Sequence, residues 1–122
     1  VVSLIDVFPT LADLAGLTPN AQVKAQLMGQ SLAPLLTNPQ ASHKPYVYSR
    51  FKAGDSVINE QLLYTEYLTA DGKQEAMLFD LAVDPQETTN VVAEEKYQQA
   101  VQRLSARLQR FKTQSEQYLP AK

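Results

Sequence analysis

Hydrophobic positions recur along the chain with two different periods, which divide it into helical and extended parts. Near the start, Val7, Leu11 and Leu14 share one face of a helix expected over residues 7–15. Residues 46–81 instead carry the aromatic and β-branched side chains typical of strands. Near the end, apolar residues return at spacings of four and three, at Tyr97, Val101, Leu104, Leu108 and Phe111. The pattern predicts helices at both ends of the chain and a sheet between them.

The first 44 residues are expected to form helices joined by polar connectors. Asp6 is placed to cap the first helix, and Gly16 is placed to end it, because glycine tolerates a left-handed backbone. The polar residues 17–26 predict a surface loop. Ser31 is expected to cap a second, short helix over residues 32–36.

The middle of the chain predicts an antiparallel meander of about four strands. The expected strands cover residues 46–51, 56–59, 62–68 and 75–81. A turn is expected at residues 53–55, and another at Asp71-Gly72. The second is the stronger signal, because both residues tolerate the positive φ of a tight primed turn.

The apolar stripe near the end predicts a long helix over about residues 94–118 that covers one face of this sheet. The stripe could instead be a coiled-coil seam, but it lasts barely three heptads and Ser115 interrupts it. The fold class is therefore α+β: a small antiparallel sheet with a long C-terminal helix packed on it, plus N-terminal helices. We expect residues 1–44 and 45–122 to form separate parts.

Composition narrows the possible functions. Hydrophobic residues make up 44% of the 122 residues and charged residues 20%, as in ordinary globular domains. The net charge is −2 without a basic cluster, so nucleic-acid binding has no electrostatic basis. The absence of cysteine excludes disulfides and thiol nucleophiles, and no apolar run reaches the roughly 18 residues of a membrane span. Because the chain starts with Val1 in what reads as the end of an earlier element, we expect a piece of a longer polypeptide.

Few residues suggest chemistry by themselves. His43, the only histidine, lies in a polar connector and reads as a loop residue rather than a catalytic base. The acidic residues Asp80, Asp84 and Glu87 lack the pattern of a calcium loop and favour a turn instead. Arg50 and Lys52 follow a strand and could meet an anionic substrate, although solvated surface charge is the simpler interpretation.

Three stretches together resemble the sulfatase family. The first runs over residues 1–17 and contains an Asp followed by a Pro-Thr helix that ends in Ala-Gly. The second is Gly29-Gln30-Ser31-Leu32-Ala33-Pro34-Leu35-Leu36, in which Met28 replaces the family's usual Asp. The third is Leu78-Phe79-Asp80-Leu81 followed by Asp84-Pro85-Gln86-Glu87-Thr88-Thr89-Asn90-Val91. The order and spacing of the three stretches also agree with the family.

Within the family, the chain is most similar to the iduronate-2-sulfatase-like branch. The segments that carry this likeness are Tyr48-Ser49-Arg50-Phe51 and Leu63-Tyr64-Thr65-Glu66-Tyr67. The chain departs from the branch at Ile58-Asn59, where an Arg-Thr pair is usual. The resemblance implies that this is the C-terminal subdomain of an alkaline-phosphatase-like α/β fold.

The resemblance also implies a parent enzyme with a formylglycine nucleophile, made within a Cys/Ser-x-Pro-x-Arg motif, and a calcium ion. This chain contains no such motif, so no catalytic or metal-binding residue is carried over to it. Its partner would be the N-terminal catalytic domain, and its expected role is to complete a pocket for sulfated sugars, with Arg50 and Lys52 near the substrate. Two alternatives stay open: a stand-alone binding module, and a piece of a related phosphonate or phosphate monoester hydrolase. The family also suggests a periplasmic or extracellular location.

Overall fold

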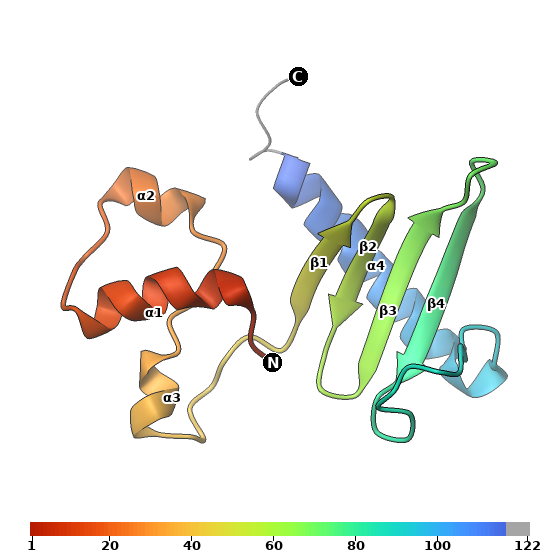
Figure 1. Ribbon diagram of the computed structural model, residues 1–122, viewed down its shortest axis with the longest axis horizontal. Coiled ribbons are helices and arrows are strands. Elements are labelled where there is room, and N and C mark those ends of the chain that lie inside the picture. Colours follow the sequence, from red (N-terminus) through yellow and green to blue (C-terminus); the bar gives the residue numbers. More distant parts are fainter. Residues whose placement is uncertain (117–122) are drawn as a thin grey trace. The chain divides into compact units, whose positions relative to one another are not determined.

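The structure is a computed structural model that describes residues 1–116. The chain forms two compact units, one of residues Val1–Pro45 and one that begins at Tyr46 (Figure 1). The first unit contains a 3-10 turn and three helices: Leu4–Asp6, α1 at Val7–Leu14, α2 at Ala21–Gln26 and α3 at Ala33–Thr37. No helix in the described part is long and apolar enough to cross a membrane.

The end of α1 confirms the role expected for Gly16. Gly16 has a φ of 67°, in the left-handed region that favours glycine. Its N–H donates to the Asp13 carbonyl over 3.0 Å, and the Leu17 N–H donates to the Ala12 carbonyl over 2.8 Å. These two bonds satisfy carbonyls at the helix end that have no partner inside the helix.

The starts of α1 and α3 differ from the prediction. Asp6 directly precedes α1, but its side chain makes no capping bond to that helix. Its carboxylate points back and accepts the Ser3 N–H over 2.8 Å. Helix α3 begins at Ala33, one residue later than expected, and its N-cap is Leu32 rather than Ser31. A proline in its first turn fits this start, because proline fixes the helical φ and lacks a donor that would have no acceptor there.

Residues 17–26 are not only loop, as predicted from their polarity, because α2 occupies their second half. The helix starts where the Asn20 side chain accepts the Val23 N–H over 2.9 Å. None of its six residues is buried. A helix without an apolar stripe leaves no periodic signal in the sequence, so only the cap could have indicated it.

The second unit contains one antiparallel sheet with the strand order β1-β2-β3-β4. The strands are β1 at Val47–Phe51, β2 at Gly54–Ile58, β3 at Leu62–Leu68 and β4 at Gln74–Asp80. All three neighbouring pairs are antiparallel. The predicted four-stranded meander is confirmed.

Both hairpin turns differ in detail from the prediction. Between β1 and β2 the turn is only Lys52-Ala53, so Gly54 and Asp55 belong to the strand rather than to the turn. Between β3 and β4 the connection is five residues, 69–73. Only Gly72 has a positive φ there, 79°. The hairpin is where Asp71-Gly72 predicts it, but the tight two-residue primed turn is wrong, because Thr69 closes a wider loop by pairing with Lys73.

The long helix α4, Gln98–Glu116, follows a 3-10 turn at Glu95–Tyr97 and lies across one face of the sheet (Figure 1). It starts later than expected, and the expected residues 117 and 118 lie outside the described part. Leu104 and Leu108 have no exposed surface and pack with Val57 and Leu78 of the sheet. The predicted stripe is thus the core of this unit, and the α+β fold class is confirmed.

Candidate functional site

The buried carboxylate of Asp6 is the central polar group of the first unit. It has no exposed surface. Its Oδ2 accepts the Ser3 N–H over 2.8 Å, and its Oδ1 accepts the Gln30 N–H over 2.9 Å and the Lys44 ammonium over 2.5 Å. Three segments that are far apart in the sequence therefore meet at one side chain.

The pKa of Asp6 reflects these donors. Burial by itself raises the pKa, because it disfavours the charged form. The hydrogen bonds from Lys44, Gln30 and Ser3 outweigh burial and lower the pKa of Asp6 to about 2. Asp6 is therefore ionised at neutral pH, which suits a structural anion and not a general acid.

The loop that follows Gly29 is fixed at the start of α1 by two hydrogen bonds. Besides the bond from Gln30 to Asp6, the Leu32 N–H donates to the Thr10 hydroxyl over 2.8 Å. A Cβ on Gly29 would lie 1.9 Å from the Ile5 carbonyl oxygen, so no larger residue fits. The first two sequence motifs that carry the family resemblance therefore bind each other.

His43 is more enclosed than a loop position suggests. Its side chain is 8% exposed, and its Nε2 lies 3.6 Å from the Asp6 Oδ2. This nitrogen is buried and has no hydrogen-bond partner among the described residues. A catalytic base needs a nucleophile within hydrogen-bond reach, and no described hydroxyl bonds to this nitrogen. The arrangement supports a structural role beside Asp6 and Lys44.

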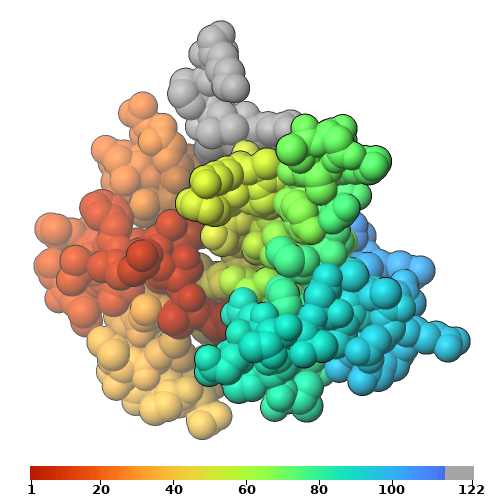
Figure 2. Space-filling model, turned by 45° about the vertical axis from the view of Figure 1, so that its right-hand side comes forward, coloured from red at the N-terminus to blue at the C-terminus, as the bar shows by residue number. Residues whose placement is uncertain are grey.

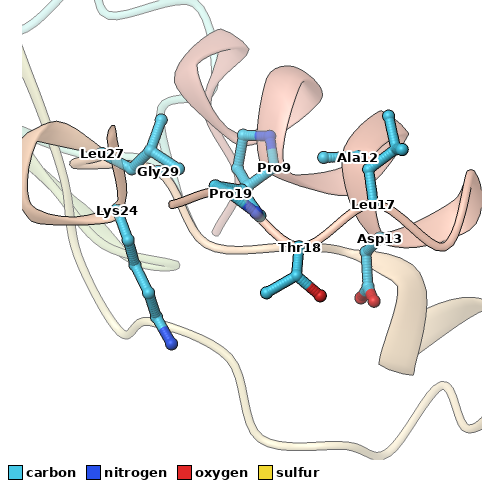
Figure 3. A pocket seen from close by; sticks show the side chains of 9 residues that line it. All are labelled: Pro9, Ala12, Asp13, Leu17, Thr18, Pro19, Lys24, Leu27 and Gly29. Atoms are coloured by element: carbon cyan, nitrogen blue, oxygen red, sulfur yellow. The ribbon is translucent and has the colours of Figure 1, made fainter. Parts of the chain in front are cut away.

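An open cleft of about 440 Å³ lies beside α1 and α2 in the first unit (Figure 3). Figure 3 shows Asp13 at one side of this cleft and Lys24 and Leu27 at the other, with Pro9 and Pro19 between them. The Asp13 carboxylate is already engaged, since it accepts the Ser31 hydroxyl over 2.7 Å. The residues that line the cleft include no histidine or cysteine, and their one carboxylate holds the Ser31 loop.

Arg50 and Lys52, the residues predicted near the substrate, lie at the β1–β2 end of the sheet. Arg50 on β1 forms an ion pair with Asp55 on β2. Its Nε donates to Oδ1 over 2.6 Å, and its Nη2 donates to Oδ2 over 3.3 Å. Lys52 is exposed in the turn, and its ammonium lies 5.3 Å from the centre of the Phe51 ring. Figure 2 shows this turn, in yellow, on the surface. The structure thus gives Arg50 a structural partner and leaves Lys52 facing outward.

Next to Arg50, the buried carboxylate of Glu66 joins the sheet to α4. Glu66 is 3% exposed and lies on β3. From α4, Ser105 donates to it over 2.6 Å, Gln109 over 2.7 Å and Lys112 over 3.0 Å. Lys112 also lies 3.5 Å from Asp55, which connects this network to Arg50. Arg50, Asp55, Glu66 and Lys112 are called the sheet–helix ion network below.

The two acids of this network have lowered pKa values. Burial raises the pKa of Glu66, but hydrogen bonds from Ser105 and Lys112 bring it below its usual value. Burial also raises the pKa of Asp55, but the hydrogen bond and the charge of Arg50 outweigh burial and lower it. Both carboxylates are therefore ionised at neutral pH. An ionised carboxylate has no proton to give, so neither group suits a general acid.

The acidic residues of the third motif hold the chain beside β4. Asp80 accepts the Tyr97 hydroxyl over 2.6 Å, and Asp84 accepts the Thr89 N–H over 2.8 Å. Asn90 follows, and its side chain accepts the Leu78 N–H over 2.9 Å on this edge strand. The turn expected at Asp84 is confirmed by the bond from the Glu87 N–H to the Asp84 carbonyl, 3.1 Å.

Over residues 1–116, no three His, Cys, Asp or Glu side chains gather in a way that could hold a metal ion. Calcium needs about six oxygen ligands in one place. The buried carboxylates of Asp6 and Glu66 are instead bound by ammonium, amide and hydroxyl donors. The residues in the described part do not fit the calcium site that the resemblance implies for the parent.

The burial of Asp6 and Glu66 was not predicted, although the sequence contains a signal for each of these carboxylates. Leu62, Tyr64 and Glu66 alternate on one face of a strand, so a charged residue stands where the pattern requires an apolar one. Asp6 follows Ser3 by three residues, the spacing of a reciprocal cap. The donors on α4 could not be identified, because the strand–helix register is a tertiary feature.

The comparisons with known proteins fit this geometry. A model of the family "N-sulphoglucosamine sulphohydrolase, C-terminal" matches residues 1–114. Arylsulfatase K of Mus musculus is 37% identical over 108 residues, which are 77% of this chain and 18% of that protein. The Delta 4,5-hexuronate-2-O-sulfatase of Bacteroides thetaiotaomicron is 33% identical over 120 residues, 91% of this chain and 24% of that protein.

Solved structures show the same fold. A Bacteroides thetaiotaomicron protein assigned as a sulfatase superposes with a TM-score of 0.72 and 30% identity, over 96% of this chain and 26% of that one. The phosphonate monoester hydrolase of Agrobacterium radiobacter superposes with a TM-score of 0.64 and 25% identity, over 89% of this chain and 24% of that one.

Fold, motifs and relatives together define a C-terminal region of the sulfatase type within the alkaline-phosphatase-like superfamily. The chain belongs to the N-sulphoglucosamine sulphohydrolase C-terminal family. It spans 18% and 24% of the lengths of the two curated relatives described above.

Proposed function

We propose that this chain works as the C-terminal subdomain of a sulfuric ester hydrolase that acts on sulfated sugars. The observation that carries the proposal is the match to a sulfatase C-terminal family over residues 1–114, with every matched motif engaged in the fold. The hexuronate sulfatase among the relatives, which aligns with 91% of this chain, supports a sugar substrate. It also supports the iduronate-2-sulfatase-like branch suggested by the sequence.

In this proposal, the described residues border the substrate pocket and hold the subdomain together. The reacting groups lie in the catalytic domain that residues 1–44 continue. A formylglycine nucleophile and a calcium ion are expected in that domain. The described part offers neither a nucleophile beside a base nor a set of metal ligands. Its two buried carboxylates are fixed anions that lock a loop to α1 and the sheet to α4.

The exposed apolar face of α1 supports the proposal that this chain is part of a larger protein. Within the described part, α1 has no buried residue. Phe8, Leu11 and Leu14 are 57%, 61% and 59% exposed. An exposed apolar stripe of this size is costly in water and marks a surface that another part of the protein covers. We assign its cover to the catalytic domain, as expected for a helix that lines an α/β sheet.

Arg50 and Lys52 are proposed to border the substrate pocket of the whole enzyme. In the full-length protein, Arg50→Ala and Lys52→Ala should raise the Michaelis constant for a sulfated disaccharide more than that for a small aryl sulfate. Because Arg50 also binds Asp55, its variant should lower stability as well, whereas Lys52→Ala should not. Equal changes for both substrates would remove these residues from the pocket.

The deciding experiment is substrate profiling of the full-length protein. Sulfated hexuronate disaccharides, aryl sulfates and aryl phosphonate monoesters are compared by kcat/KM. The proposal expects the sulfate esters to be preferred. A preference for the phosphonate would favour the second candidate, which the fold shared with the phosphonate monoester hydrolase keeps open. Sugar binding by the chain without hydrolysis by the full-length protein would favour a stand-alone module.

A further inference from the structure

The face of the sheet opposite α4 carries a shallow hollow beside the β1–β2 turn. Glu66 points to α4, so its neighbours on β3, Thr65 and Tyr67, lie on the opposite face. The strand register sets Phe51 in line with Tyr67, and Ser56 in line with Thr65. The hollow has a volume of about 380 Å³, and Lys52 lies at its rim. It is called the outer hollow below.

The chemistry of the outer hollow combines an apolar platform with a cation. Phe51 is 74% exposed, and the Lys52 ammonium lies 5.3 Å from the centre of its ring. The hydroxyls of Ser56 and Thr65 bond to each other over 2.8 Å in the floor. The Tyr67 hydroxyl donates to Glu75. The part of Tyr67 that faces the hollow is therefore taken to be its ring. Aromatic faces accept the C–H faces of sugar rings, and an ammonium attracts a sulfate.

The backbone of Lys52 provides an independent observation. Its φ is 52°, in the left-handed region where glycine is favoured and a side chain is strained. Two-residue hairpin turns commonly place glycine at such a position. Glycine would adopt this backbone with less strain, so the geometry of the turn does not by itself account for a lysine here.

We propose that the outer hollow is a subsite for a sulfated sugar unit of the substrate. The sugar ring stacks on Phe51, and the sulfate pairs with the Lys52 ammonium. This inference rests on the proposed function, because it assumes a sulfated glycan substrate. It adds the residue that stacks, the residue that pairs with the anion and the face of the sheet on which they act.

The variants Lys52→Gly and Phe51→Ala in the full-length protein test the subsite. Each should raise the Michaelis constant for a heparin-derived sulfated disaccharide about fivefold more than that for an aryl sulfate, the scale of one exposed contact. Lys52→Arg and Phe51→Trp should keep the wild-type value. Lys96→Ala is the matched control, because Lys96 also lies over a ring, 4.7 Å from the centre of Tyr97.

Stability separates this role from a structural one. Lys52→Gly should melt no lower than the wild type, since glycine relieves the strained backbone. Unchanged Michaelis constants in both variants would overturn the subsite. Lower melting of Phe51→Ala with equal losses on both substrates would show that this face packs on the catalytic domain instead, which also overturns it.

A separate binding assay distinguishes failure of the subsite from failure of the proposed function. If the full-length protein hydrolyses no sulfate ester, the proposed function fails. Equilibrium binding of the same disaccharide to the wild type and to Lys52→Gly then decides the subsite alone. Weaker binding by the variant supports the subsite, and equal binding or none overturns it.

Discussion

The Asp6 carboxylate accepts a hydrogen bond from the Gln30 backbone N–H over 2.9 Å, across 24 residues of sequence. This bond joins the first two motifs of the family. It explains why an acid precedes the Pro-Thr helix and why a glycine precedes Gln30. Because the Lys44 ammonium binds the same carboxylate, one buried charge holds three separate segments of the first unit together.

Replacing Asp6 with alanine should destabilise the first unit by roughly 3 kcal/mol, since it leaves a partly buried ammonium and two partly buried N–H groups without their acceptor. Hydrogen exchange can measure this locally. The Gln30 amide should exchange slowly in the wild type and fast in the variant. Glu60→Ala, which removes an exposed carboxylate of the second unit, is the control and should leave the Gln30 amide protected.

The lowered pKa of Asp6 predicts an acid limit for the same unit. An acid whose folded pKa is below its unfolded value contributes stability above the unfolded value, which is lost as the pH falls through the folded one. For Asp6 this window extends from about 3.8 down to about 2. The protection of the Gln30 amide against hydrogen exchange should therefore weaken as the pH falls between these values. A protection unchanged down to pH 2 would contradict the ion pair.

Gly29→Ala and Gly16→Ala should destabilise the first unit for different reasons. The Cβ at position 29 has no room, because it would lie 1.9 Å from the Ile5 carbonyl oxygen, and a cost of roughly 1–3 kcal/mol or more is expected. The Cβ at position 16 meets nothing within 4 Å, so only the left-handed backbone costs, about 1 kcal/mol. Denaturant midpoints should rank the two variants in that order, and the reverse order would refute the close approach.

Leu104→Ala should cost roughly 2–5 kcal/mol, because the side chain is fully buried between α4 and the sheet. A urea titration followed by circular dichroism measures the change. Gln102→Ala, on the exposed side of the same helix, should shift the midpoint little. An unchanged midpoint for Leu104→Ala would show that the helix does not depend on the sheet.

A double-mutant cycle of Glu66 and Lys112 should give a coupling energy of about 1–3 kcal/mol, because Glu66 is buried and bonded to that ammonium over 3.0 Å. The same cycle on Glu94 and Lys96, an exposed pair at 3.1 Å, is the control and should show no measurable coupling. Equal coupling in both cycles would mean that the sheet–helix ion network gains nothing from burial.

Residues 1–122 alone should not hydrolyse an aryl sulfate, with or without calcium. The reaction needs a strong nucleophile, charge stabilisation and a proton donor, and the described part assembles none of these. Turnover above that of an unrelated protein, surviving His43→Ala, would reveal a catalytic group in this chain.

The sequence by itself determined the order and type of most elements. Alternating residues specify the strands, and the stripe through Leu104 and Leu108 specifies the last helix. Apolar side chains that are buried on one face recur with the period of the strand or helix, and the linear sequence shows that period. Gly16 is similarly readable, since its backbone requirement is local. The helix over 21–26 left no such record, because no residue of it is buried.

Only the tertiary structure decided which polar groups meet. Asp6 reads as a helix cap until Gln30 and Lys44 are brought beside it, and Arg50 reads as a free cation until β2 places Asp55 opposite. Three of the donors to Glu66 come from a helix 39 to 46 residues away. A hydrogen bond depends on distances of about 3 Å between polar atoms. Hydrophobic periodicity shows which face of a helix or strand is buried, but it does not give those distances. The sequence could therefore assign this chain to its family and fold, while the sites of its charges had to come from packing.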